Sequence, residues 1–154
     1  MLAAHRSLAS LRSTNGVHMG ERIPMVDYLV LDDGEPPHLV AHECTSCGAR
    51  FFDRRNACAK CFATEFQTVP VATEGTVRTF TIVTFAAPPG VPVPPFVASV
   101  VDCDGTQVRA NLVNVEPDPP DHVHDGMKVR LSTYSLGTDT EGTEAIGFGF
   151  EPIA

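Results

Sequence analysis

The sequence predicts an all-β protein in which a short metal-binding ribbon precedes a five-stranded barrel. Two observations carry this prediction. Residues 44–62, CTSCGARFFDRRNACAKCF, hold two Cys-x-x-Cys pairs, Cys44/Cys47 and Cys58/Cys61. From Gly75 onward, runs rich in β-branched and aromatic residues alternate with turn-forming stretches, and no segment makes a convincing helix.

The composition fits at most two small folded domains. The chain has 154 residues, a formal net charge of −8 and 43% hydrophobic residues, which is ordinary for a globular protein. It has no apolar run near the roughly 18 residues that a membrane-spanning helix needs. The opening MLAAHRSLASLRSTNG is basic and Ser-rich, so it loosely resembles a transit peptide; the preferred interpretation is a frayed leader, or a true start at Met19. Because a secretory apolar core is missing, we expect a cytoplasmic protein.

The ribbon is expected at residues 38–70, after an N-terminal lead of residues 1–37 that is poorly ordered in part. HLVAHEC (38–44) has the character of a strand that enters the first cysteine pair. ARFF (49–52) and FQTVPV (66–71) are expected to pair with it. Strands this short bury too little apolar surface to fold alone, so a metal must stabilise the ribbon.

The barrel is expected at residues 71–154. Its five predicted strands are, in order, residues 75–85, 96–103, 106–113, 127–135 and 144–150. Asp104-Gly105 is the two-residue signal of a type I′ hairpin, and the glycines of GFGF (147–150) indicate a bend or a close backbone contact. A long first strand could bend to serve both sides of a closed barrel, which suggests an OB-fold; an open five-stranded meander is the alternative.

The four paired cysteines predict a metal site. Two Cys-x-x-Cys turns can offer four thiolates in a tetrahedron, which suits Zn²⁺ or rubredoxin-type iron, and Gly48 fits the tight turn after the first pair. Two disulfides, or a redox dithiol, are the alternative. Because all four positions are cysteine, no ligand position is left for water, so the metal is expected to be structural zinc. The fifth cysteine, Cys103, lies between two aspartates that raise its pKa, and we interpret it as a spectator thiol.

The weaker motifs each have an ordinary explanation. His122 and His124 could bind a metal, but a solvated loop is favoured, and His42 is expected near the metal site or exposed. The prolines could form a polyproline II ligand or a stiff connection between strands; they are residues 88, 89, 92, 94 and 95.

A basic rim surrounds the cysteines. It consists of Arg50, Arg54, Arg55 and Lys60. This rim could meet a few phosphates or an acidic protein surface, although a plain solvated face is slightly favoured. Beyond Phe62 the chain has four basic residues against twelve acidic ones, and such a barrel would repel a polyanion.

Six ordered segments carry a resemblance to a known family. They are CTSCGARFF with CAKC, GTVRTFTIV, PPFVASVVDCDG, ANLVNVEP, DGMKVRLS and the terminal FGFEP, and they run from about residue 39 to the end. The set resembles the acyl-CoA-associated OB-fold proteins with a rubredoxin-like zinc ribbon, catalogued as domain of unknown function thirty-five. The resemblance implies an all-β chain in which a rubredoxin-like zinc ribbon precedes a five-stranded OB-fold barrel.

The functional expectation also follows from the resemblance. Such proteins are small non-catalytic subunits of thiolase-like enzymes, among them thiolases, acyltransferases and lipid-transfer-protein-like aldolases, and they are thought to complete the partner's acyl-CoA channel. Structural zinc would lie on the four paired cysteines, and the basic rim would contact CoA phosphates or the partner. A nucleic-acid-binding zinc-ribbon module is the alternative from another class, and a small iron electron carrier is a third.

Overall fold

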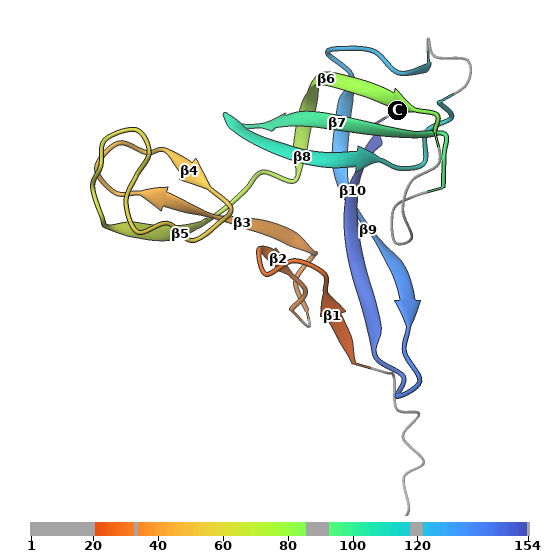
Figure 1. Ribbon diagram of the computed structural model, residues 1–154, viewed down its shortest axis with the longest axis horizontal. Coiled ribbons are helices and arrows are strands. Elements are labelled where there is room, and N and C mark those ends of the chain that lie inside the picture. The colour runs from red at the N-terminus through yellow and green to blue at the C-terminus, as the bar shows by residue number, and fades with distance from the viewer. Residues whose placement is uncertain (1–20, 33, 86–92, 118–121, 154) are drawn as a thin grey trace, which may run out of the picture.

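The computed structural model describes residues 21–32, 34–85, 93–117 and 122–153. Across these ranges the chain is all-β, as predicted. Figure 1 shows a small ribbon that projects to the left of a barrel, and a long hairpin that descends from the barrel. The expectations for the leader, for Met19 and for the prolines at 88, 89 and 92 lie outside the described residues. In the described ranges, no helix has the length and apolar character needed to cross a membrane.

The ribbon is built on the three strands that the sequence predicted. They are β3 (His38–Cys44), β4 (Arg50–Phe51) and β5 (Phe66–Pro70), and both β4 and β5 pair antiparallel with β3. One further strand, β2 (Leu29–Val30), comes from the N-terminal lead and pairs with the start of β3. Cys44 is the last residue of β3, and the loops that connect β3, β4 and β5 carry Cys47, Cys58 and Cys61.

A closed barrel follows the ribbon. Its strands are β6 (Glu74–Val83), β7 (Phe96–Cys103), β8 (Thr106–Leu112), β9 (Lys128–Thr138) and β10 (Glu144–Pro152). They pair in the order β10-β8-β7-β6-β9, and β9 pairs back onto β10, so the five strands close on themselves. Strand β10 runs parallel to β8 and antiparallel to β9. The closure rules out the open meander and confirms the OB-fold.

The β9–β10 hairpin extends well past the barrel wall (Figure 1). Strand β9 continues to Thr138, three residues past the predicted end of this strand at residue 135. A short strand from the lead, β1 (Arg22–Pro24), pairs parallel with the outer part of β10, where Arg22 lies opposite Glu144. All three β1 residues are exposed and show no alternation, which is why the sequence did not predict this strand.

Two local predictions about turns and glycines are confirmed. Asp104 and Gly105 have φ angles of 51° and 82°, which is the positive-φ pair of a type I′ turn. A Cβ at Gly149 would lie 2.8 Å from the backbone oxygen of Asn111, so only glycine allows β10 to approach β8 this closely.

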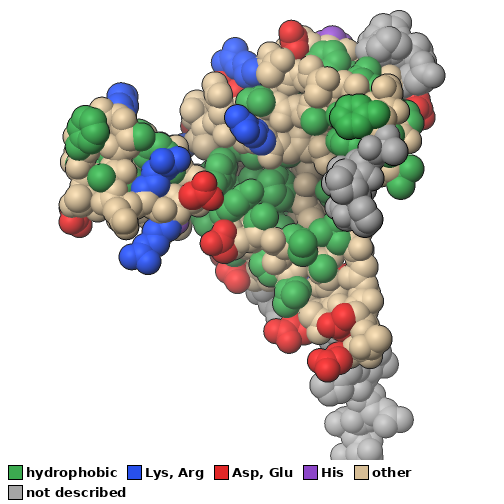
Figure 2. Space-filling model, viewed as in Figure 1, with side chains coloured by type: hydrophobic (Ala, Val, Ile, Leu, Met, Phe, Trp, Pro, Cys, Tyr) green, Lys and Arg blue, Asp and Glu red, His purple; other side chains and the backbone are tan. Residues whose placement is uncertain are grey.

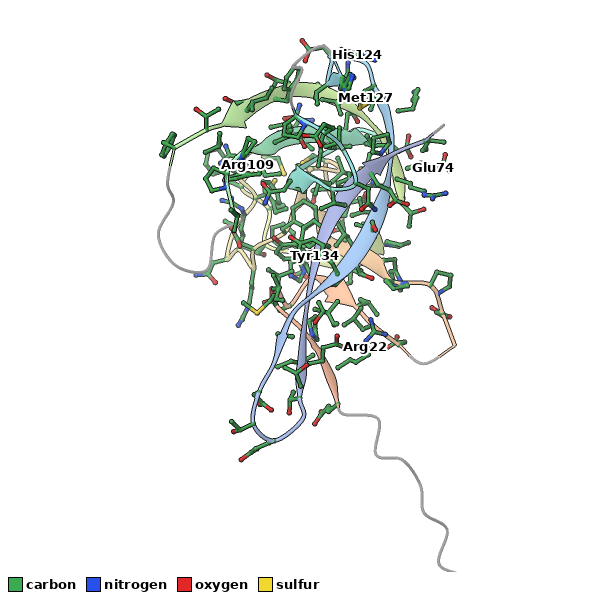
Figure 3. The ribbon with its side chains drawn as sticks, turned by 90° about the vertical axis from the view of Figure 1, so that its right-hand side faces the viewer. Arg22, Glu74, Arg109, His124, Met127 and Tyr134 are labelled. Carbon is green, nitrogen blue, oxygen red and sulfur yellow. The ribbon has the colours of Figure 1, made fainter. Side chains whose placement is uncertain are left out.

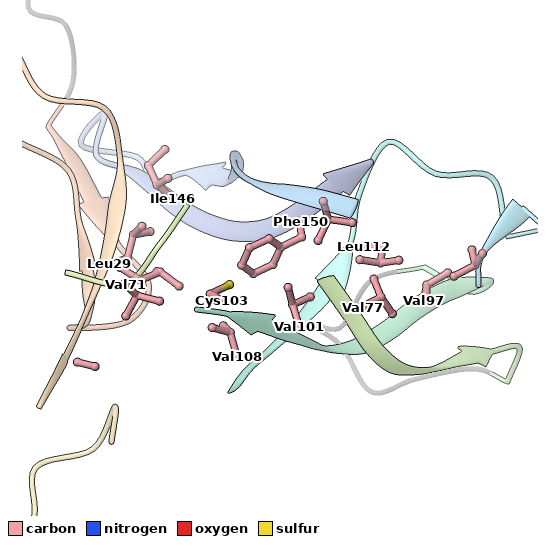
Figure 4. Packing of buried hydrophobic residues seen from close by; sticks show 14 residues of the cluster. Leu29, Val71, Val77, Val97, Val101, Cys103, Val108, Leu112, Ile146 and Phe150 are labelled. Carbon is pink, nitrogen blue, oxygen red and sulfur yellow. The ribbon is translucent and has the colours of Figure 1, made fainter. Parts of the chain in front are cut away.

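One continuous apolar core joins the barrel to the base of the ribbon. In β7 every second residue from Val97 to Cys103 is buried. Figure 4 shows Phe150 inside the barrel and Leu29 and Val71 at the far end of the same cluster, which also includes Leu39 of β3. The ribbon base is therefore held by barrel contacts as well as by the cysteine site.

Candidate metal centre and adjoining groove

The two cysteine turns have the same backbone hydrogen bonds. In the first turn, the Gly48 N–H donates to the Cys44 oxygen (2.9 Å), and the Cys44 N–H donates to the Ala49 oxygen (2.9 Å). In the second turn, the Phe62 N–H donates to the Cys58 oxygen (2.9 Å), and the Cys58 N–H donates to the oxygen of the residue after Phe62 (2.8 Å). Gly48 and Phe62 are thus equivalent positions, and their φ angles of 69° and 63° are nearly equal.

The four sulfurs lie at the separations of a tetrahedral metal site. The Sγ atoms of Cys44 and Cys61 are 3.6 Å apart, as are those of Cys47 and Cys58, and all four lie within 4.8 Å of one another. A tetrahedron with Zn–S bonds of about 2.3 Å places its sulfurs about 3.8 Å apart. A disulfide needs about 2.05 Å, so the disulfide alternative does not fit.

Two of these thiols, Cys58 and Cys61, have pKa values that their surroundings shift in opposite directions. Burial opposes ionisation of Cys58, but hydrogen bonds from the backbone N–H groups of Lys60 and Cys61 outweigh it and lower its pKa to about 6. The Ala63 N–H favours the Cys61 thiolate, yet the neighbouring sulfurs and burial outweigh that bond and raise the pKa of Cys61 to about 12. Without a metal, Cys61 therefore stays protonated at neutral pH, whereas a bound divalent metal favours its thiolate.

The site is a structural zinc site. Cys44, Cys47, Cys58 and Cys61 supply four sulfur ligands, which leave no coordination position for water or substrate. Two of the four cysteines, Cys44 and Cys58, are buried, and Cys61 is exposed at the end of the second turn. The metal fixes the two loops of the ribbon and supplies no reaction centre.

His42, His122, His124 and Cys103 are not ligands of this site. Among the described residues, the four cysteines form the metal-ligand cluster that the structure shows, and His42, His122 and His124 are not part of it. Cys103 is fully buried in the barrel core. Its burial, together with the nearby Asp102 carboxylate, raises the pKa of Cys103 to about 11, which agrees with a spectator thiol.

The basic rim is divided between internal and exposed roles. Arg50 donates from Nε to Glu43 Oε2 at 2.6 Å and from Nη1 to Thr106 Oγ1 at 3.1 Å, so it ties the ribbon to the β7–β8 hairpin. The Arg55 guanidinium stacks over the Phe51 ring, 4.5 Å from its centroid. Arg54 and Lys60 are exposed, and the structure gives their side chains no hydrogen bond or ion pair with any described residue.

A groove of about 570 Å³ opens on the barrel wall formed by β6, β7 and β8. Its lining combines the rings of Tyr28, Phe80 and Phe148 with one charged side chain, Arg109. Figure 2 shows hydrophobic side chains gathered in the hollow between the ribbon and the long hairpin. Figure 3 shows Arg109 on the barrel wall, above Tyr134 of the hairpin.

Tyr28 connects this groove to the ribbon. A second hollow, of about 300 Å³, shares Tyr28 and Arg109 with the groove and extends to Arg55. The Tyr28 ring lies 4.8 Å from that of Phe52 in the ribbon and 6.0 Å from that of Phe148 in β10. No local sequence pattern predicts this surface, because its residues come from the lead, the ribbon and the barrel and meet only in the fold.

Family comparisons agree with this architecture. Residues 32–67 match the model of the rubredoxin-like zinc ribbon domain of ChsH2, and residues 68–133 match that of the C-terminal OB-fold domain of ChsH2. The chain belongs to the ChsH2 family. The two matches adjoin and together cover about two thirds of the chain, and residues 32–67 contain all four cysteines of the zinc site.

Two relatives extend this comparison. A protein of Methanocaldococcus jannaschii described as a DUF35 domain-containing scaffold protein is 27% identical over 118 residues, which cover 75% of this chain and 82% of that protein. The solved structure of the Ltp2-ChsH2(DUF35) aldolase contains a chain that is 27% identical to this one, with a TM-score of 0.58. That match covers 75% of this chain and 84% of the other.

Proposed function

We propose that this protein is a non-catalytic subunit that binds a thiolase-superfamily enzyme and helps that enzyme to bind acyl-CoA. The enzyme would be a thiolase, an acyltransferase or a lipid-transfer-protein-like aldolase. The observation that carries the proposal is the saturated sulfur site, because a metal with four protein ligands organises structure and does not activate substrate. The scaffold description of one relative and the aldolase complex that contains another support a role in assembly.

The groove supports the acyl-CoA part of the proposal. Its apolar lining suits an acyl chain or the pantetheine arm, and Arg109 offers a positive charge beside that lining. From the ribbon, Arg54, Arg55 and Lys60, with Arg50 adding charge, would contact the CoA phosphates or the partner. The catalytic cysteine and histidine would belong to the partner enzyme.

Co-purification from the source organism tests the assembly role. The tagged full-length chain is expected to recover a thiolase-like enzyme in a fixed ratio, identified by mass spectrometry. The isolated chain is expected to leave an acyl-CoA thioester intact, while the complex turns it over. A chain that remains monomeric and captures no thiolase-like enzyme would contradict the proposal.

Substrate kinetics of the purified complex test the acyl-CoA role. Arg109→Ala is expected to raise the KM for acyl-CoA several-fold and to leave kcat nearly unchanged, because the groove contributes binding and no chemistry. Arg22→Ala is the matched control, since Arg22 is also exposed but lies on β1, outside the groove. Equal KM values for the Arg109 variant and the wild type would remove the groove from the proposal.

We also propose that the protein does not bind nucleic acid. The barrel carries a strong excess of acidic residues, and polyanion binding depends on phosphate neutralisation by a basic surface. A gel-shift assay with single-stranded DNA or RNA at physiological salt is expected to show no complex.

A further inference from the structure

The second cysteine turn carries an aromatic side chain, Phe62, that is not buried in the fold. Phe62 is 80% exposed, although it follows directly after the zinc-binding Cys61. Its backbone has φ 63°, in the left-handed region that bulky residues rarely adopt. Gly48 occupies the equivalent position of the first turn: its N–H donates to the Cys44 oxygen, as the Phe62 N–H donates to the Cys58 oxygen. Glycine would therefore satisfy the backbone at position 62 without strain.

The strain at Phe62 has no visible compensation within the described chain. A buried ring could offset an unfavourable backbone conformation through packing, but a ring that is 80% exposed contributes little. Isolated exposed hydrophobic residues are common on protein surfaces. Phe62 differs from such residues because its backbone is left-handed, at a position where the first cysteine turn has glycine. Unusual backbone conformations of this kind cluster at functional sites.

We propose that Phe62 is a docking residue, whose ring inserts into an apolar pocket of the partner protein. This inference rests on the proposed function, because it requires a protein partner, and it names the contact through which the ribbon would engage that partner. Aromatic anchors that fill a pocket commonly dominate the affinity of protein interfaces. The zinc site immediately before Phe62 fixes the backbone of the turn, so the ring is presented with little loss of conformational entropy on binding.

The basic residues near the second cysteine turn indicate which side chains would surround the partner's pocket. Lys60, two residues before Phe62, lines a hollow between the ribbon and the β7–β8 hairpin. Arg54 and Arg55 line a hollow of the ribbon together with Thr64 and Glu65. Neither Lys60 nor Arg54 has an ion pair with a described residue. We therefore expect aspartate or glutamate side chains around the partner's apolar pocket.

A protein pocket fits Phe62 better than a small molecule does. Small-molecule sites are concave and surround about 70–90% of their ligand. A ring that is itself 80% exposed instead projects from the surface, as the inserted member of an interface does. Stacking against the adenine ring of a nucleotide is the competing possibility, and the experiment below separates the two.

The first test uses Phe62→Gly in the full-length zinc-bound chain, with the thiolase-like enzyme recovered by co-purification as the probe. The variant is expected to retain one zinc per chain and to have an unchanged or higher Tm, because glycine removes the left-handed strain. Its affinity for the enzyme, measured by titration calorimetry, is expected to fall by about thirty-fold or more, as for an interface hot spot. Phe85→Ala, which removes another exposed phenylalanine, is the matched control and is expected to leave the affinity unchanged.

The second test places p-benzoylphenylalanine at position 62, a near-isostere that cross-links on irradiation. In the complex it is expected to cross-link to the enzyme, at a peptide that contains apolar residues next to aspartate or glutamate. Cross-linking to a second copy of this chain, or none to the enzyme, would contradict the inference.

The possible failures are distinguishable. If the wild type captures a thiolase-like enzyme and Phe62→Gly binds it equally well, the docking role is wrong and the proposed function stands. A lower Tm or lost zinc in Phe62→Gly would show a structural role instead, and weakened CoA binding with unchanged enzyme affinity would show adenine stacking. If the wild type captures no such enzyme, the proposed function and this inference fail together.

Discussion

The guanidinium of Arg50 in the ribbon donates a hydrogen bond to the hydroxyl of Thr106 in the barrel, 3.1 Å away. Thr106 is buried at the start of β8, directly after the type I′ turn. This bond fixes the ribbon against the β7–β8 hairpin, and Arg50 also pairs with Glu43. Among the described residues, Arg50 is thus the member of the basic rim that joins the ribbon to the barrel, whereas Arg55 contacts Phe51 within the ribbon.

The Arg50–Thr106 bond is expected to have a measurable coupling energy. Arg50→Met and Thr106→Val should each lower the free energy of unfolding, because each variant removes one partner of a partly buried hydrogen bond. In a double-mutant cycle, measured by urea unfolding of the zinc-bound chain, we expect a coupling of about 1 kcal/mol. Additive effects of the two substitutions would show that this bond does not stabilise the junction.

Removal of zinc is expected to disorder the ribbon loops while the barrel largely remains. The purified protein should be colourless and contain one zinc per chain by elemental analysis, which also tests for iron. A strong chelator should abolish the NMR dispersion of residues 44–49 and 58–63 and preserve that of β6 to β10, because the barrel has its own apolar core. Cys61→Ser should weaken zinc binding, whereas Cys103→Ser should retain the metal. Unchanged ribbon signals without zinc would contradict the scaffolding role.

Gly149→Ala is expected to destabilise the barrel by about 2 kcal/mol, because a Cβ there would lie 2.8 Å from the Asn111 oxygen and overpack the β8–β10 contact. Gly147→Ala is the matched control in the same strand. Its Cβ would meet the side chains of Tyr134 and Leu136 at 3.1–3.2 Å, and side chains can move. Thermal unfolding should therefore show a larger loss at position 149, and equal losses would argue against the close strand approach.

Asp102 is expected to contribute to the acid sensitivity of the fold. Hydrogen bonds from Arg78 and from the Gly105 N–H, together with the Arg78 charge, lower the pKa of Asp102 below its ordinary value. A lowered pKa in the folded state means that the contribution is complete above about pH 4 and is lost as the pH falls through the lowered value.

The comparison of Asp102→Asn with the wild type isolates this effect. Acid also displaces zinc by protonating the cysteines, but that loss is common to both proteins. The difference in unfolding free energy between them should therefore shrink as the pH falls below 4. A difference that is independent of pH would contradict the assignment.

Local patterns were sufficient to predict the three paired strands around the cysteines, the five barrel strands and the metal site. The strand at 38–44 has the predicted limits, and the type I′ turn at Asp104-Gly105 depends only on two adjacent residues. The ligands likewise lie in two short motifs. Features that depend on distant contacts were missed: β1 forms only because β10 offers it a partner, and the groove exists only where Tyr28, Arg109 and Phe148 meet.

One apolar cluster includes Leu39 of the ribbon and Phe150 of the barrel. This shared core holds the ribbon and the barrel in one fixed relative orientation. An enzyme that binds both the ribbon and the barrel must therefore have two contact surfaces at one fixed distance and angle. An enzyme with suitable surfaces at a different angle would not bind to both.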